Sequence, residues 1–389
     1  MSKTIKDIVL LSLITTIITF LIWLPHFLAL PNFYGLDFSS GFSNIYKNYD
    51  GLEYITIAKS FYNPDLIASI PQSLSANYYA AHFPLYSIFI LFFGPIFGML
   101  KSMLFVSLIF TIFSAIAFYF LVRDFQLSTK PLWLSIIFLL LPARWIIVHS
   151  IGSSEPTFIF FVITSIYFFM KFESQKKSKY ILLSSIFGLF AQLTRPPGIL
   201  LFLSLLLYIH WKYFLPLSLS KFKQNFKAHL SYYPLILIPV GLLGVFYIFN
   251  LNYNDFWAYF HSGDNIHLTF PPFQVFNKSQ YWVGEIWLED IIFVFLLGIL
   301  GGLTLIKQKL YPLAFFVLTY LVATSLVTHR DVSRYALPIF PFVLIAFEKV
   351  LTTKEFKIVL AVLLLALYLY SQNFLIHNVA PIANLNPYN

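Results

Sequence analysis

The sequence predicts an all-α polytopic membrane protein with about eleven transmembrane helices, and its composition leads directly to this class. Hydrophobic residues make up 59% of the 389 positions and charged residues only 11%. Soluble domains carry about a quarter charged residues. The mean hydropathy is +0.78. The absence of cysteine excludes disulfides and thiolate metal ligands or nucleophiles. The net charge of +9 fits basic cytoplasmic loops, so we expect no nucleic-acid partner.

Eleven apolar stretches account for the predicted spans, since a helix that crosses the membrane takes roughly 20 mostly apolar residues. In chain order they are 8–30, 103–122, 131–150, 156–171, 180–194, 198–214, 231–250, 290–306, 311–328, 336–351 and 356–376. The first is long for a signal peptide and lacks a small-residue cleavage site, so we expect a retained anchor. A further run at 84–100 is ambiguous, because it is short and carries Pro84, Gly94, Pro95 and Gly98.

Lysine-rich loops predict the orientation of the chain. The segments 171–179 and 211–229 carry four lysines each, and we expect both to be cytoplasmic. The N-terminus then also lies inside, while the segments 31–102 and 251–289 lie outside. This assignment requires that 84–100 lies at the outer surface or dips into the membrane without crossing it.

The opposite solution places the N-terminus outside, makes 84–100 a true span and moves 31–82 to the cytoplasm. In the preferred orientation 17 of the 25 Lys and Arg residues are cytoplasmic, whereas 11 of the 16 Asp and Glu residues are external. Acidic residues contribute little to topology, so their external excess points to chemistry at that face. No internal repeat or soluble domain is visible, and residues 1–389 are expected to form a single integral membrane domain.

Two carboxylates open a predicted helix in the first external segment, within YDGLEYITIAKSFY at 49–62. Asp50, Glu53 and Tyr54 have helical spacing, with Asp50 at or before the first turn. One interpretation is a helix cap followed by a first-turn acid, both favoured by the helix dipole. The other is a general base at the mouth of a membrane cavity, and the two roles are compatible.

Two further external motifs carry a titratable side chain. His82, in AAHFPLY, is a candidate phosphate ligand or proton relay, although an isolated histidine more often packs at the interface. Glu155, in GSSEPTF, is either a first-turn acid or a carboxylate that faces a partner or a cavity, because acids near membrane depth are costly.

Three arginines occur on predicted external turns, where the positive-inside rule disfavours them. Arg195 lies in QLTRPPGI, and Arg330 and Arg334 lie in THRDVSRYALPIFPF. Each has a structural explanation, namely an ion pair, for example with Asp331, or contact with a lipid headgroup. Because all three are predicted at the face that collects the acids, they also suggest a phosphate-bearing substrate.

The long external loop 251–289 is rich in aromatic residues, as a membrane-interface belt or a sugar site would be. These residues are Trp257, Tyr259, Tyr281, Trp282 and Trp287. No Gly-rich phosphate loop, HExxH, GxSxG or DxD-type metal motif occurs in the sequence. A cytosolic nucleotide-sugar donor is therefore not expected.

The ordered motifs resemble those of the PIG-V-like (GPI mannosyltransferase 2-like) glycosyltransferases, which have the GT-C fold. The matching positions run in order over about 45–345: Tyr49-Asp50, Tyr54, Ile57-Ala58, His82-Phe83-Pro84-Leu85-Tyr86, Ser154-Glu155, Thr194-Arg195, Gly198, Asn254-Asp255-Phe256-Trp257-Ala258, Arg334-Tyr335, Leu337 and Phe340-Pro341. Two departures leave the sugar and the acceptor open. Tyr49 replaces the family's Trp, and Pro196-Pro197 replaces a polar pair.

The resemblance implies a GT-C-like bundle and transfer of a sugar, with mannose expected, from a polyprenyl- or dolichyl-phosphate donor to a lipid-linked or cell-envelope acceptor. Transfer would occur on the non-cytosolic face with inversion, and Asp50 would be the base. Arg195 and Arg334, with His82, would stabilise the leaving phosphate, and Glu155 would orient a sugar or the arginines. The remaining residues expected to bind substrate are Glu53, Tyr54, Arg330 and Tyr335.

The implied donor is a monophosphate, so arginine can replace a metal, and no obligatory metal or other cofactor is expected. The resemblance and the Lys, Ile and Asn usage suggest an integral protein of a prokaryotic plasma membrane, or of the endoplasmic reticulum in a eukaryote.

Two other functions stay open from the sequence. One is an enzyme of the same fold that acts on a lipid A-like lipid, a cell-wall polymer or a protein. The other is a flippase or exporter of lipid-linked saccharides that does no chemistry. A transporter should show polar positions through the midplane and pseudo-symmetric halves, whereas this chain collects its polar residues at one face.

Overall fold

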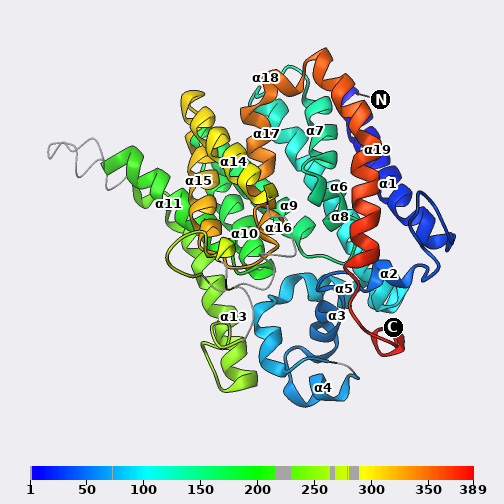
Figure 1. The fold of residues 1–389 in the computed structure, drawn as a ribbon. Helices are drawn as coiled ribbons and strands as arrows, with labels where there is room; N and C mark the ends of the chain where they lie inside the picture. Colours follow the sequence, from blue (N-terminus) through cyan, green and yellow to red (C-terminus); the bar gives the residue numbers. More distant parts are fainter. Residues whose placement is uncertain (1, 72, 215–228, 263–267, 278, 280–288) are drawn as a thin grey trace. The chain divides into compact units, whose positions relative to one another are not determined.

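The computed structural model describes residues 2–71, 73–214, 229–262, 268–277, 279 and 289–389. Within these ranges the regular elements are helices, and the β contacts are isolated bridges. Figure 1 labels the helices along the chain. By its internal contacts the chain divides into two compact units. Unit 1 comprises 1–160, 245–263 and 348–389, and unit 2 comprises 161–244 and 264–347. Each unit is described by itself.

Six helical segments in the described ranges are long and apolar enough to cross a membrane. They are α1 (Lys3–Phe27), α6 (Met99–Asp124), α9 (Glu155–Gln175), η3 with α13 (Tyr233–Tyr253), α14 (Glu289–Lys307) and α19 (Lys354–His377). The bent pair of α7 (Pro131–Leu140) and α8 (Ala143–His149) is a seventh candidate. The predicted class of an all-helical polytopic membrane protein is therefore confirmed.

Several predicted spans are shorter helices in the structure. Apolar helices of 10–17 residues are α5 (Pro84–Phe97), α11 (Gly198–Phe214), α15 (Tyr311–Ser325) and the stretch Val332–Ala346. The 14 residues of α5 give a length of about 21 Å, which is less than the roughly 30 Å of a bilayer core. The length of α5 thus agrees with the prediction that 84–100 does not cross the membrane.

Two predicted spans are interrupted, and proline is the physical reason in both. The stretch 131–150 bends by 78° between α7 and α8, where Leu141 is extended and Pro142 lacks an N–H. The stretch 336–351 is divided into short helices, the first two of which begin next to Pro338 and Pro341. These are η5 (Leu337–Ile339), α17 (Phe340–Ala346) and α18 (Glu348–Leu351).

In unit 1, the start of the segment 31–102, which is predicted to be external, folds into short helices. They are α2 (Ser43–Tyr46), α3 (Gly51–Ser60), α4 (Pro64–Ser69) and η1 (Ala76–Ala81). Helix α3 contacts both α5 and α6. Its inward side is apolar, with Ile55 and Ile57 fully buried. This packing fixes the position of the residues at the start of α3.

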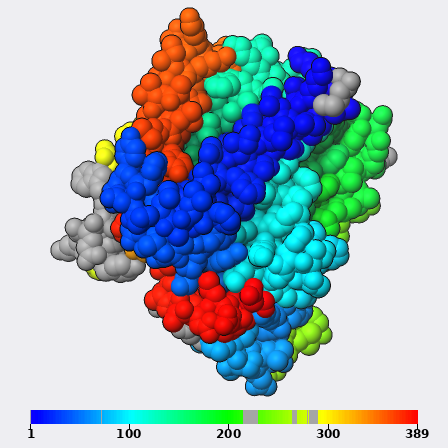
Figure 2. Space-filling view, turned by 90° about the vertical axis from the view of Figure 1, so that its right-hand side faces the viewer, coloured from blue at the N-terminus to red at the C-terminus, as the bar shows by residue number. Residues whose placement is uncertain are grey.

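The C-terminal segment lies against the segment predicted to be the first external one, a contact that the sequence does not predict (Figure 2). The N–H of Ala380 donates to the Lys47 carbonyl at 2.9 Å. The buried Asn48 donates from Nδ2 to the Leu375 carbonyl at 2.9 Å. The ammonium of Lys59 donates to the Pro387 carbonyl at 2.8 Å. The backbone on both sides of Asp50 is therefore anchored to the end of α19 and the segment that follows it.

In unit 2, helix α14 packs on α15 and α17 through glycines. A Cβ atom at Gly301 would lie 3.1 Å from Val343, and one at Gly302 would lie 2.6 Å from Leu318. The absence of side chains at these positions allows close helix–helix approach, as is common between membrane helices. Unit 2 also contains α10 (Ser178–Thr194) and α16 (Val332–Tyr335), which carry the arginine turns.

Candidate active site

The sequence Asp50-Gly51 places a carboxylate at the start of α3, as predicted. Asp50 is the N-cap residue, but its side chain makes no capping hydrogen bond. A Cβ atom at Gly51 would lie 3.0 Å from the Gly152 carbonyl oxygen and 2.7 Å from Met103 Sδ. Glycine at this position therefore lets the first turn of α3 approach the 152–155 segment closely, which brings two of the predicted motifs together.

His82 lies beside Asp50. Its Nε2 atom is 4.0 Å from Asp50 Oδ1, and 31% of the Asp50 side chain is exposed against 8% of the His82 side chain. The His82 ring packs against Tyr54 and Tyr78, with centroids 5.2 and 5.4 Å away. Its carbonyl accepts a 2.6 Å hydrogen bond from the Tyr62 hydroxyl. His82 is thus a buried group next to the candidate base and not an isolated interfacial side chain.

Glu53 lies one helical turn after Asp50 and is in a different environment. Its Oε2 atom is shielded from solvent and has no hydrogen-bond partner among the described residues. Burial, together with the neighbouring charge of Asp50, raises the pKa of Glu53 to about 8. At neutral pH Glu53 is therefore mostly protonated, so two carboxyl groups on one helix turn are in different states.

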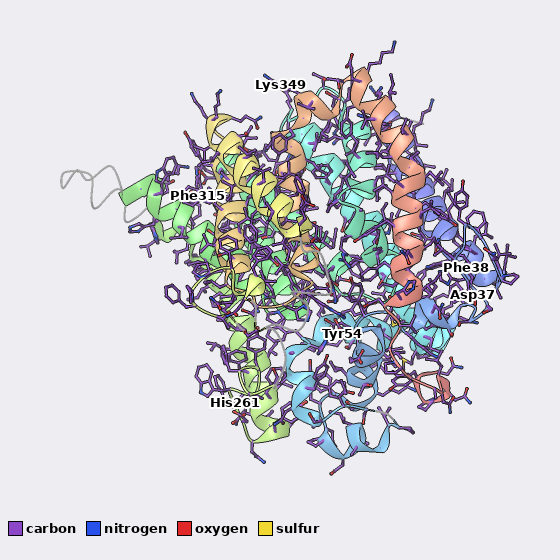
Figure 3. The ribbon with its side chains drawn as sticks, viewed as in Figure 1. Asp37, Phe38, Tyr54, His261, Phe315 and Lys349 are labelled. Carbon is purple, nitrogen blue, oxygen red and sulfur yellow. The ribbon has the colours of Figure 1, made fainter. Side chains whose placement is uncertain are left out.

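Tyr54 connects α3 to the Glu155 motif. Its hydroxyl lies 2.8 Å from Ser154 Oγ (Figure 3, where Tyr54 is labelled). The Ser153 hydroxyl donates to the Glu155 carboxylate, and Glu155 is only 1% exposed. Ser107 of α6 in turn accepts from the Ser153 N–H at 3.2 Å. Glu155 is therefore a buried carboxylate with a hydroxyl donor, held in the same unit as Asp50.

Arg144 belongs to this site, although it is not among the residues predicted from the sequence. Its Nη1 donates to the Tyr49 hydroxyl at 3.0 Å, and its guanidinium lies 4.3 Å from the ring centroid of Phe374. Tyr49 has a left-handed backbone with φ of 49° and precedes Asp50 directly. The signal that could have found Arg144 is an arginine inside the apolar stretch 131–150, since a charge at membrane depth usually marks function.

The other predicted substrate-binding residues lie in unit 2, on the predicted turns. Arg195 is the C-cap residue of α10. The chain reverses sharply after it, because a Cβ atom at Gly198 would lie 2.4 Å from the Gln192 Cα. Arg334 on α16 is 4% exposed, whereas Arg330 is exposed. The Tyr335 hydroxyl lies 3.4 Å from His329 Nδ1. That these side chains meet Asp50 stays a prediction.

The described part of the loop 251–289 contains aromatic side chains in contact. Phe246 packs against Trp257 and Phe260, with centroids 5.8 and 5.9 Å away. Asp255 accepts a 2.7 Å hydrogen bond from His261, which lowers the pKa of Asp255. The predicted aromatic positions Tyr281, Trp282 and Trp287 lie outside the described residues.

The groups near Asp50 suit proton transfer. A part-exposed carboxylate, a histidine, a protonated glutamic acid and a buried glutamate occur within one unit. No group of three or more His, Asp or Glu side chains in the described part of the chain is placed to hold a metal ion.

Comparison with solved structures places the fold among the GT-C glycosyltransferases. ArnT from Cupriavidus metallidurans in the apo state has a TM-score of 0.53 and 13% identity, over 80% of this chain and 57% of that one. ArnT bound to undecaprenyl phosphate gives 0.57 and 11%, over 90% and 63%. The archaeal oligosaccharyltransferase AglB from Archaeoglobus fulgidus, in complex with an inhibitory peptide and a dolichol-phosphate, gives 0.53 and 12%, over 98% and 56%.

These likenesses show that the chain has the polytopic GT-C fold, as predicted. The chain spans about three-fifths of the length of these neighbours. No protein-family model and no curated protein matches its sequence.

Proposed function

We propose that this protein is a membrane glycosyltransferase that moves a sugar from a polyprenyl-phosphate donor to a lipid-linked or cell-envelope acceptor. The observation that carries the proposal is the part-exposed Asp50 carboxylate beside His82, at the start of α3, on a GT-C fold. The solved neighbours support a lipid-phosphate substrate, because one is bound to undecaprenyl phosphate and another to a dolichol-phosphate.

The Asp50 carboxylate accepts the proton of the acceptor hydroxyl. The hydroxyl oxygen then bonds to the anomeric carbon on the face opposite the phosphate, and the bond from that carbon to the phosphate oxygen breaks. The electron pair of the broken bond leaves on the polyprenyl phosphate. One displacement inverts the anomeric configuration, so a single carboxylate base is sufficient.

The protonation of Glu53 supports the choice of Asp50 as the base. Two negative carboxylates within one helix turn would repel each other and would also repel a phosphate donor. Because the pKa of Glu53 is raised to about 8, Glu53 can donate a hydrogen bond at neutral pH. Asp50 is left to accept the proton.

The leaving phosphate requires positive charge, for which we propose Arg195 and Arg334, with His82 beside the base. Arg330 and Tyr335 flank Arg334 and are proposed to contact the donor. Glu155 is proposed to orient the sugar through its carboxylate. Because a monophosphate donor needs no metal to neutralise a diphosphate, we expect activity without added metal.

The motif order shared with the PIG-V-like enzymes favours mannose as the sugar, and the excess of external acids favours the non-cytosolic face. Tyr49, which replaces the Trp of those enzymes, lies next to the proposed base.

The test uses the purified full-length protein with labelled polyprenyl-phosphate mannose and a panel of lipid and glycan acceptors. We expect labelled product with inverted configuration, and a loss of about 100- to 10,000-fold in the Asp50→Asn variant. The Asp65→Asn variant is the matched control, because Asp65 is an exposed acid of the same external segment and should retain activity. Near-normal transfer by Asp50→Asn would remove Asp50 from the role of base. Label that crosses sealed vesicles unchanged would identify a flippase instead.

A further inference from the structure

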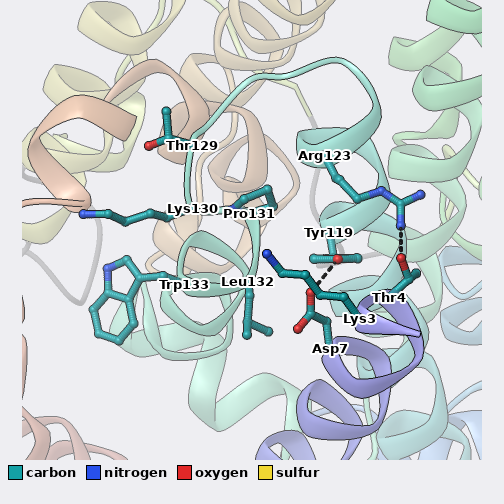
Figure 4. Close-up of a pocket in the computed structure, with 10 residues that line it drawn as sticks. All are labelled: Lys3, Thr4, Asp7, Tyr119, Arg123, Thr129, Lys130, Pro131, Leu132 and Trp133. Atoms are coloured by element: carbon teal, nitrogen blue, oxygen red, sulfur yellow. Dashed lines mark hydrogen bonds between the residues drawn. The ribbon is translucent and has the colours of Figure 1, made fainter. Parts of the chain in front are cut away.

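A cavity of about 420 Å³ lies in unit 1, where three helices begin or end. It is lined by the start of α1, the last turns of α6 and the first residues of α7 (Figure 4). Its lining residues include Lys3, Asp7, Arg123, Lys130 and Trp133. The volume falls within the roughly 300–1,000 Å³ of sites for small ligands.

This cavity is separate from the candidate active site. Met103 contacts the start of α3, whereas Arg123 lies near the other end of the same helix α6. The twenty residues between them correspond to about 30 Å of helix, the thickness of a bilayer core. Because α6 is long and apolar enough to span a membrane, such a span would place the cavity at the interface opposite to that of Asp50.

The charged side chains of the cavity suit a ligand that has both an anionic group and a hydrogen-bond donor. Arg123 is held in place, because Nη1 donates to Thr4 Oγ1 at 3.0 Å and the other nitrogens donate to Asp124. Lys3 has no ionic or hydrogen-bonded partner in the described ranges. Lys130 donates to the Thr352 carbonyl at 2.8 Å, and its ammonium has two further donors.

One carboxylate lines the same cavity. Asp7 is 9% exposed and accepts a 2.7 Å hydrogen bond from the Tyr119 hydroxyl through Oδ2 (Figure 4). Its other oxygen can accept from a bound ligand. Asp124 neutralises the charge of Arg123. Lys3 and Lys130 carry two positive charges and Asp7 carries one negative charge, so the net charge of these three groups is +1. A ligand with a phosphate and a hydroxyl fits this arrangement better than a bare phosphate.

The remaining wall is apolar and typical of a membrane interface. Pro131, Leu132 and the Trp133 ring line it. The Trp133 indole donates to the Leu351 carbonyl at 3.0 Å, and Lys357 lies 5.0 Å from its ring. Tryptophan is enriched at the headgroup level of membranes. An occupant with acyl chains would therefore keep its chains in the bilayer while its headgroup entered the cavity.

We propose that this cavity binds the headgroup of an anionic phospholipid whose phosphodiester carries a hydroxylated group, as in phosphatidylglycerol. Lys3 and Lys130 contact the phosphate, and Asp7 accepts a hydrogen bond from the headgroup hydroxyl. Basic pockets between membrane helices recognise lipid headgroups in this way. The site requires no transferase chemistry and stands independently of the function proposed for Asp50.

The experiment titrates short-chain phosphatidylglycerol into the detergent-solubilised full-length protein and follows the melting temperature. Phosphatidylcholine of the same chain length is the reference lipid, and glycerol phosphate supplies the headgroup without chains. We expect a saturable rise with phosphatidylglycerol only, and an affinity about 10-fold weaker in the double variant Lys3→Gln/Lys130→Gln. The control variant is Lys6→Gln, which removes an exposed lysine of α1 that does not line the cavity; it should bind normally.

The variant Lys3→Arg/Lys130→Arg keeps both charges and should restore binding, which separates loss of the site from misfolding. An equal rise with phosphatidylcholine would overturn the proposal, as would unchanged affinity in the double Gln variant. An equal effect of glycerol phosphate would also overturn it, because the site would then bind a soluble anion and not a lipid.

Discussion

The Nε2 atom of His82 lies 4.0 Å from the Oδ1 atom of Asp50, although the two residues belong to different short helical elements. His82 is held by two tyrosine rings and by a hydrogen bond to its carbonyl. A histidine in this position can orient the base or contact the donor phosphate, so its loss should affect chemistry more than folding.

We therefore expect His82→Gln to lower kcat/KM by about 10- to 100-fold while the melting temperature changes little. Tyr78→Phe is the matched control, because it removes only the hydroxyl of a ring that packs on His82. Steady-state kinetics with the labelled donor would measure both. Activity of His82→Gln equal to that of Tyr78→Phe would place His82 outside the chemistry.

Glu53 predicts a pH dependence of activity. Its pKa is raised to about 8, so it gains a negative charge as the pH rises through that value. The new charge lies beside Asp50 and would repel a phosphate donor, so kcat/KM should fall above about pH 8. The Glu53→Gln variant should lose this alkaline limb and keep activity at neutral pH. If kcat/KM of Glu53→Gln still fell above about pH 8, the decrease would be due to the ionisation of another group.

The same residue predicts a pH dependence of stability. The folded protein retains the Glu53 proton while the unfolded chain releases it near the usual glutamate pKa, about 4.3. The unfolded state then binds fewer protons, so the free energy of unfolding decreases as the pH rises from about 4.3 and levels off above about 8. Melting curves should show Glu53→Gln stabilised relative to wild type at pH 8 and little changed at low pH. Equal differences at both ends would contradict the raised pKa.

The close approach of Gly51 to Gly152 predicts a packing requirement. Gly51→Ala would place a Cβ atom 3.0 Å from the Gly152 carbonyl and 2.7 Å from Met103 Sδ. We expect a loss of about 1–3 kcal/mol in the free energy of unfolding, and a larger loss of activity because α3 carries Asp50. Gly244→Ala is the control, since a Cβ atom added there would meet nothing within 4 Å. A stable and fully active Gly51→Ala protein would show that α3 can shift without cost.

Arg144 is predicted to act through Tyr49, which precedes Asp50. Arg144→Gln and Tyr49→Phe each break the 3.0 Å hydrogen bond between them, so each should lower kcat. If both act through that bond, the double variant should be no worse than the more damaging single one. Transfer kinetics on the three variants complete the cycle, and fully additive losses would mean that the two residues act separately.

The sequence predicted the local features of the site because these depend on local patterns. The helical spacing at 50–61, the turn at Arg195 and the short α5 all follow from nearby residues. The sequence did not show that His82 lies beside Asp50, because that contact joins separate elements. The contact of the C-terminal segment with Lys47 was missed for the same reason. It is made by backbone groups, so it does not depend on which side chains the sequence carries there.

The hydrophobicity of the sequence also did not indicate two helix breaks and one charged residue of the site. The run 131–150 is apolar enough to suggest a continuous span, yet Pro142 divides it. The run 336–351 is divided in the same way at Pro338 and Pro341. Arg144, which follows the break at Pro142, was counted with the span and not considered as part of a site. Attention to a proline followed closely by a charge inside an apolar run would have identified both the bend and the arginine.

The proposed function requires that Asp50, Arg195 and Arg334 share one substrate pocket. The chain has no cysteine, so a cysteine cross-linker reacts only at the introduced cysteine pairs. The direct test of this shared pocket is cross-linking by a reagent of about 10 Å. One test pair is Asp50→Cys with Arg334→Cys, and the other is Asp50→Cys with Arg195→Cys. The control pair is Asn48→Cys with Asn378→Cys, whose native side chains lie 3.3 Å apart. Our account predicts that at least one test pair links and that polyprenyl phosphate blocks the reaction. If the control pair links and neither test pair does, the shared pocket is contradicted.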